Sequence, residues 1–131
     1  MIVGFPGETN NDFLKTYNFL NELDISYLHV FTYSERPDTD AVKMGETVSK
    51  EKRAERSRML HILSDKKCRF FYDQFVNQRR PVLFENMKNG KLLGHTDNYI
   101  KVQMDGTPDL INAIHSVKLS GNYGGFVQGI L

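Results

Sequence analysis

The first 36 residues constrain the fold most, because they predict a strand, a turn, a helix and a second strand in direct succession. The apolar residues 1–3 are typical of a buried strand, and Gly4, Pro6 and Gly7 end it within four residues because they favour turns. Residues 27–33, rich in aromatic and β-branched side chains, predict the second strand. We therefore expect a β-α-β unit with parallel strands and a right-handed crossover.

The intervening helix has a start signal and an apolar stripe. Thr9 can cap it, and Asp12, three residues later, can complete a capping box. Asp24 and Ser26 end it. Apolar side chains at helical spacing should cover the sheet, and these are Phe13, Leu14, Tyr17, Leu20 and Leu23.

The two turns that leave the predicted strands should lie at one edge. In barrels and open α/β sheets, ligands bind at the carboxyl ends of the strands. Glycines let a ligand approach the backbone, and the amides near Thr9 can receive an anion. Tyr33, Ser34 and Arg36 add a stacking face, a hydroxyl and a positive fork. An ordinary tight turn is the alternative for the glycine segment.

Two motifs resemble those of the radical S-adenosylmethionine methylthiotransferases. They are Ile-Val-Gly-Phe-Pro-Gly-Glu-Thr at residues 2–9 and Val-Phe-Thr-Tyr-Ser-Glu-Arg-Pro at residues 30–37, followed by Thr39 and Ala41. In that family a partial (β/α) barrel holds iron-sulfur clusters and S-adenosylmethionine, and a small carboxy-terminal β-barrel called TRAM binds RNA. The second motif is most similar to the branch that acts on N6-threonylcarbamoyladenosine in tRNA. Asp38 departs from the family glycine, although aspartate tolerates positive φ.

The resemblance implies part of a cofactor wall and a contact with RNA. Cleavage of S-adenosylmethionine yields the radical in this family, and a second molecule supplies the methyl group. Arg36 could reach an RNA phosphate or the substrate's carboxylate, or it could pair with Glu35 or Asp38. The implied cofactor-binding residues are Gly4, Phe5, Pro6, Gly7, Phe31 and Tyr33.

The chain has a single cysteine, Cys68, which excludes an intrachain disulfide framework and any cysteine-rich metal site. The implied chemistry needs a Cys-x-x-x-Cys-x-x-Cys loop, because thiolates ligate four-iron clusters. We therefore expect no catalytic residue and no metal ligand here. The chain should be a carboxy-terminal fragment that is inactive without the amino-terminal portion of the enzyme. Its unfinished sheet would leave edges open to self-association.

The composition is that of an ordinary globular protein, with 40% hydrophobic and 25% charged residues in 131. It has no long apolar span and no signal peptide, so we expect a cytoplasmic protein without a membrane partner. The net charge of +1 conceals a basic middle part. Residues 1–48 contain 3 Lys and Arg but 8 Asp and Glu, and residues 49–80 contain 10 Lys and Arg but 4 Asp and Glu. Residues 81–131 contain 4 of each kind.

The basic part predicts one long helix or two abutting ones, capped by Ser49 and ending near Gln78. Its first half is polar nearly all round, which fits either a solvated helix or a phosphate-facing surface. Its second half should pack through an apolar face that includes Leu60 and Leu63. Residues 1–78 are thus expected to form the terminal β-α-β portion of the partial barrel with this helix.

Residues 79–131 predict an all-β domain, a small five-stranded antiparallel barrel, and the resemblance implies that it is of the OB-like TRAM type. The strands are expected at 81–85, 91–96, 99–103, 114–119 and 126–131, and residues 94–99 resemble TRAM. Ile100 and Val102 should face the core, with Tyr99 and Lys101 outward.

Aromatic, polar and cationic side chains on this domain suit RNA. Its neutral charge balance predicts modest affinity unless the arginines and the helix contribute. Two hypotheses remain, a part of a tRNA methylthiotransferase or a stand-alone RNA-binding module; a fragment of a ribosomal-protein methylthiotransferase is a third. The predicted RNA-binding residues are Arg36, Arg79, Arg80, Lys91, Thr96, Asn98, Tyr99 and Lys101.

Overall fold

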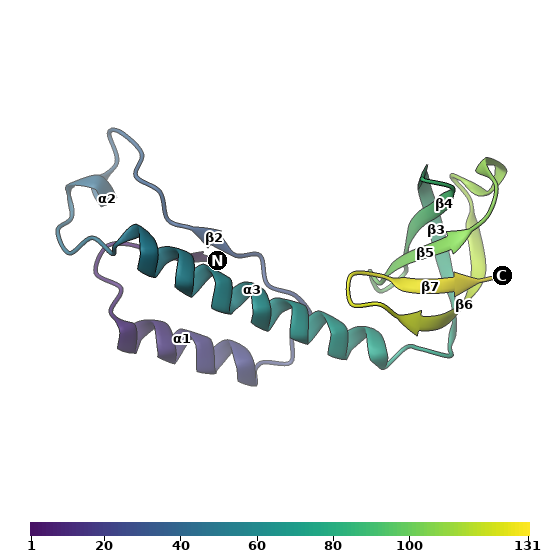
Figure 1. The fold of residues 1–131 in the computed structure, drawn as a ribbon, viewed down its shortest axis with the longest axis horizontal. Coiled ribbons are helices and arrows are strands. Elements are labelled where there is room, and N and C mark those ends of the chain that lie inside the picture. Colours follow the sequence, from purple (N-terminus) through teal and green to yellow (C-terminus); the bar gives the residue numbers. More distant parts are fainter. The chain divides into compact units, whose positions relative to one another are not determined.

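The computed structural model describes all residues from 1 to 131 and divides them into two compact units (Figure 1). The α/β unit comprises residues 1–67, and the barrel unit comprises residues 68–131. The predicted class, an α/β part followed by a small β-barrel, is confirmed. No helix is long and apolar enough to cross a lipid bilayer.

The α/β unit contains a parallel pair of short strands, β1 (Ile2–Val3) and β2 (Phe31–Thr32). Ile2 lies opposite Phe31, and the amide of Tyr33 donates to the carbonyl of Val3 over 2.8 Å. The β-α-β order is therefore confirmed. The second strand is shorter than the predicted residues 27–33, because β1 offers only two residues to pair with before its glycine turn.

Helix α1 (Asn10–Glu22) begins with the predicted capping box. The Thr9 hydroxyl accepts the amide of Asp12 over 3.1 Å, and the Asp12 carboxylate accepts the amide of Thr9 over 3.1 Å. Only part of the predicted apolar stripe packs. Phe13 is buried, whereas Leu14 and Leu23 are exposed, because a two-stranded sheet is too narrow to cover the whole stripe.

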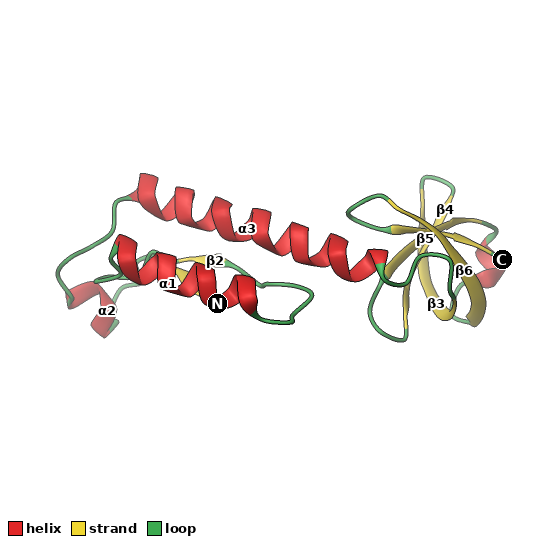
Figure 2. Ribbon diagram, turned by 90° about the horizontal axis from the view of Figure 1, so that it is seen from below, coloured by secondary structure: helices red, strands yellow, loops and turns green.

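A loop with the one-turn helix α2 (Asp40–Lys43) leads to the long helix α3 (Lys50–Asp73). The Ser49 hydroxyl caps α3 by accepting the amide of Lys52 over 3.3 Å. Figures 1 and 2 both show α1 beside α3. The helix ends before the predicted Gln78 because the chain turns after Asp73, and Asn77 has a φ of 73°. The core of this unit is formed by Val3, Phe13, Leu28, Leu60 and Leu63.

The barrel unit is a closed barrel with the strand order β3-β4-β5-β7-β6. The prediction of an all-antiparallel barrel is wrong for one pair, because β5 and β7 run parallel. An odd number of strands cannot alternate in direction all the way round a closed ring, so one pair must be parallel. The elements are β3 (Arg79–Lys88), β4 (Lys91–Thr96), β5 (Lys101–Asp105), the 3₁₀ turn η1 (Pro108–Leu110), β6 (Ile114–Asn122) and β7 (Val127–Ile130).

The barrel core contains side chains from all five strands and from the end of α3. Ile100 and Val102 are buried while Tyr99 and Lys101 are exposed, so the predicted alternation is confirmed. Cys68 is half-buried and packs against this core. The buried members are Tyr72, Val82, Phe84, Leu92, Ile100, Val102, Met104, Val117, Leu119 and Val127.

Candidate functional site

The glycine turn after β1 is held by a buried ion pair. Gly4 and Gly7 have φ values of 79° and 87°, which favour glycine. The Glu8 carboxylate accepts the amide of Gly4 and a guanidinium N–H of Arg56, each over 2.8 Å. Arg56, from α3, also donates to the Glu8 carbonyl over 2.9 Å and to Asn10 Oδ1 over 2.7 Å. One buried guanidinium therefore fixes the turn to the start of α1.

The turn after β2 is held by a second buried arginine, Arg53. Its Nη2 and Nη1 donate to the Glu35 carboxylate over 2.5 and 3.1 Å, and its Nε donates to the Val48 carbonyl over 2.8 Å. Its guanidinium carbon lies 5.2 Å from the centroid of the Tyr33 ring. A Cβ added to Gly4 would lie 2.5 Å from Arg53 Cγ, so the glycine permits close approach as well as positive φ. Arg53 thus connects the two turns.

Sequence analysis missed the roles of Arg53 and Arg56, because it treated the first half of α3 as polar all round. Both residues are buried, so neither belongs to a solvated face or a phosphate-facing surface. The spacing of the two arginines along the helix indicates their burial. They precede Leu60 and Leu63 at helical intervals, and the four side chains form one buried stripe.

The predicted cofactor residues divide into two groups. Phe5 and Phe31 are exposed, and Ile2 lies opposite Phe31 on the sheet and is also exposed, so this edge offers apolar surface. Tyr33 is half-buried against Arg53. The turn amides of Gly4, Gly7 and Glu8 donate to the Glu8 carboxylate, the Glu46 carbonyl and the Phe5 carbonyl, respectively. These three amides are therefore engaged within the protein, and Pro6 is buried within the turn.

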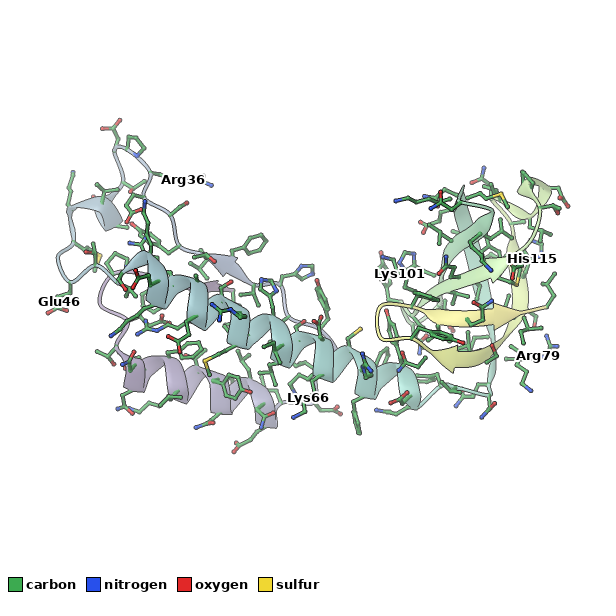
Figure 3. All side chains as sticks on the ribbon, in the orientation of Figure 1. Arg36, Glu46, Lys66, Arg79, Lys101 and His115 are labelled. Atoms are coloured by element: carbon green, nitrogen blue, oxygen red, sulfur yellow. The ribbon has the colours of Figure 1, made fainter.

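Arg36 lies on the exposed loop between β2 and α2, where Figure 3 shows it projecting from the ribbon. Its guanidinium forms no ion pair, because Glu35 pairs with Arg53 and not with its sequence neighbour. Asp38 has a φ of 61°, a left-handed conformation that favours glycine but that aspartate tolerates. The side chain of Arg36 is free to contact a ligand.

The Arg53–Glu35 pair predicts acid sensitivity. Hydrogen bonding to Arg53 lowers the pKa of Glu35 from an ordinary 4.5 to about 2. Because the folded pKa is depressed, the stabilisation is complete above pH 4.5 and is lost as the pH falls toward 2. The free energy of unfolding, measured in urea, should therefore fall more steeply across this pH interval for the parent than for Glu35→Gln. Parallel pH profiles would show that the pair contributes nothing, and an NMR titration of the Glu35 carboxyl gives the direct check.

The barrel unit carries an outward row of side chains across four strands. Lys101 on β5 lies opposite His95 on β4, His95 opposite Leu83 on β3, and Leu83 opposite Ile114 on β6. The Tyr99 ring is 82% exposed and lies 5.3 Å from the His95 ring, centroid to centroid. We call Leu83, His95, Tyr99, Lys101 and Ile114 the barrel face.

Thr96 and Asn98 build the turn that presents Tyr99. The buried Thr96 hydroxyl accepts the amide of Ile100 over 2.8 Å and donates to Asn98 Oδ1 over 2.6 Å. Tyr99 has a φ of 68° in this turn. These three predicted residues and Lys101 are therefore brought together, Tyr99 and Lys101 as contact groups and the other two as support.

The other predicted cations of the barrel unit are engaged elsewhere. Arg80 pairs with Asp97 through two hydrogen bonds of 3.0 and 3.1 Å, with its guanidinium carbon 5.0 Å from the Phe75 ring centroid. Lys91 pairs with Asp105 over 2.5 Å. Arg79 donates to the Ser116 carbonyl over 3.2 Å, and Figure 3 shows it well separated from Lys101. Sequence analysis had no means of choosing these carboxylate partners.

The structure contains no group of three or more His, Cys, Asp or Glu side chains that could hold a metal ion.

No family model matches the chain. It is 40% identical over 124 residues to the threonylcarbamoyladenosine tRNA methylthiotransferase MtaB of Bacillus subtilis, covering 91% of this chain and 28% of that protein. It is 39% identical over 106 residues to MtaB of Aquifex aeolicus, and this match covers 81% of this chain and 25% of that protein.

A relative of a second kind is matched along the whole chain. This is the tRNA-2-methylthio-N(6)-dimethylallyladenosine synthase of Geobacter metallireducens, 32% identical over 133 residues, which cover 100% of this chain and 30% of that protein. The chain therefore spans less than a third of the length of these curated relatives.

Proposed function

Since this chain is homologous over most of its length to tRNA methylthiotransferases, we propose that it forms part of such an enzyme and binds its tRNA. The higher identity to the two MtaB proteins supports threonylcarbamoyladenosine as the modified base. In this proposal, residues 1–78 form part of the wall that holds the cofactor, and residues 79–131 bind the RNA. A stand-alone RNA-binding module is the alternative, favoured by the closed barrel with its own core.

The exposed ring of Tyr99 carries the RNA part of the proposal. The Thr96–Asn98 turn holds this residue in a left-handed conformation with 82% of its surface in solvent. An aromatic ring presented to solvent on such a turn can stack on an unpaired base. Lys101, two residues later, is exposed and forms no ion pair, so its ammonium group can reach the adjacent phosphate.

The β1–β2 edge is the proposed part of the S-adenosylmethionine wall. Its exposed Phe5 and Phe31 fit the apolar and ring portions of that molecule, while the amides of Gly4, Gly7 and Glu8 are already engaged within the protein. Gly4, Pro6 and Gly7 shape the turn, and Tyr33 borders it. When bound, S-adenosylmethionine and the iron-sulfur clusters supply the radical and methyl-transfer chemistry. We expect this chain alone to bind tRNA without modifying it.

Removing the Tyr99 ring should weaken tRNA binding about 5- to 150-fold, because stacking contributes about 1–3 kcal/mol per base. Tyr99→Asn is the preferred change, since asparagine tolerates the φ of 68°. Lys101→Ala should make the negative slope of log K against log salt shallower by about 0.7, the value for one single-strand phosphate contact. Fluorescence anisotropy with tRNA at about 50 and about 200 mM salt measures both effects.

Two matched variants control for the loss of an exposed ring or cation. Tyr123→Asn removes an aromatic side chain that is 66% exposed but lies outside the barrel face, and Lys88→Ala removes an exposed lysine from the end of β3. Both should bind tRNA as the parent does. If Tyr99→Asn also binds like the parent, the barrel face is not the RNA site.

A further inference from the structure

A cationic groove lies within the α/β unit, between the end of β2 and one face of α3. It is open and measures about 650 Å³. On the strand side it is lined by residues 32–35. On the helix side it is lined by Lys50, Arg53, Ala54, Ser57, Arg58 and His61, and we call the whole the α3 groove.

The charges that line the α3 groove are not balanced. Its one carboxylate, Glu35, is neutralised by Arg53 in the ion pair described above. Lys50 and Arg58 are exposed and form no ion pair, so two positive charges remain without partners. The acidic neighbours on α3, Glu51 and Glu55, do not line the groove. The groove therefore attracts anions.

Hydroxyl groups without partners line the same groove. Tyr33 lines the groove, and its hydroxyl oxygen is buried and has no hydrogen-bond partner, a state that costs free energy. Ser34 and Ser57 also contribute hydroxyls. Phosphate oxygens are acceptors only, so they match a lining of hydroxyl and guanidinium donors, and the planar fork of Arg58 suits two-point binding of phosphate.

The spacing of the two free cations distinguishes between anions. Lys50 and Arg58 are eight residues apart on a helix, which corresponds to about 12 Å along its axis. A single small anion at the midpoint would have to draw both long side chains inward, whereas successive phosphates of a nucleic-acid strand can meet each in place. The spacing therefore favours an extended polyanion.

We infer that the α3 groove binds backbone phosphates of the tRNA, as a second RNA contact on a different unit from the barrel face. This inference rests on the proposed function, since it takes tRNA as the polyanion. Arg53 and Arg56 have no part in the contact, because their donors are committed to the two turns. The groove would read no sequence, since phosphate contacts position an RNA without specifying its bases.

The test is tRNA binding by the full chain as a function of salt. The double variant Lys50→Ala/Arg58→Ala should make the negative slope of log K against log salt shallower by about 1.4, twice the value for one single-strand contact. Ser57→Glu should weaken binding further, because it adds a negative charge to the groove. Lys66→Ala is the matched control, an exposed lysine of α3 outside the groove lining (Figure 3), and it should bind like the parent.

Tyr99→Asn, measured in the same series, separates the two failures. If the double variant keeps the parental slope while Tyr99→Asn weakens binding, the groove inference is overturned and the proposed function stands. If neither change affects binding, or the chain binds no tRNA, both are overturned. Because Lys50 and Arg58 are exposed, the circular dichroism melting curve of the double variant should match that of the parent. A shallower salt dependence with an unchanged melting curve supports the contact.

Discussion

Arg56→Ala is expected to lower the free energy of unfolding of the α/β unit by about 3–5 kcal/mol, the range for breaking a buried ion pair by removing one partner. The Glu8 side chain is 3% exposed and would be left as a buried carboxylate without its cation. The Glu8 carbonyl and Asn10 Oδ1 would each lose a donor as well. Urea denaturation, followed with hydrogen exchange of the α/β unit, measures the loss.

Two further variants show whether the ion pair is the cause. Arg58→Ala removes an exposed arginine two residues further along the helix, and it should change the stability by about 0.5 kcal/mol at most. In a Glu8→Gln background the cost of Arg56→Ala should fall by about 0.5–3 kcal/mol, since no charge is then left unpaired. The interpretation fails if Arg56→Ala costs as little as Arg58→Ala.

Arg53 and Arg56 also support the proposed cofactor edge, because they hold the two turns beside it. Arg56 reaches the Gly4 turn through Glu8, whose carboxylate accepts the Gly4 amide. Arg53 reaches the Tyr33 turn and also lies against Gly4. Both arginines come from one helix at a spacing of three residues, so α3 sets the positions of two turns that lie far apart in sequence.

Features of the fold that depend on near neighbours could be predicted from the sequence. The capping box of α1 needs only Thr9 and Asp12, which are three residues apart. The outward position of Lys101 and the burial of Val102 follow from alternation along β5. The predicted strand began at residue 99, so the exposure of Tyr99 could be predicted, but its place in the turn before β5 could not.

Features that depend on distant partners could not be predicted. The carboxylate of Glu8 is 48 residues from Arg56, and nothing in the pattern of α3 names it. The short length of β2 is set by the glycine turn after β1, which limits the ladder from the other strand. The pairing of Arg80 with Asp97 depends on how β3 and the turn after β4 meet in space.

Phe84→Ala is expected to lower the free energy of unfolding of the barrel unit by about 3–5 kcal/mol, as large-to-small changes in well-packed cores do. The ring is completely buried and belongs to the barrel core. Gly94 lies opposite Phe84 on the neighbouring strand, and its own side-chain space is closed by the backbone of Leu83 and Phe84. The strands therefore cannot move closer to refill the cavity. Urea denaturation, with hydrogen exchange across β3 to β7, measures the loss.

The neighbouring residue supplies the control, because alternation places Leu83 on the barrel face and Phe84 in the core. Leu83 is 42% exposed, so Leu83→Ala should cost about 1 kcal/mol or less while weakening tRNA binding. Phe84→Ala should show the reverse, with tRNA affinity retained at temperatures where the barrel stays folded. If both variants lost affinity in proportion to lost stability, the RNA contact would require only an intact barrel and not the particular side chains of its face.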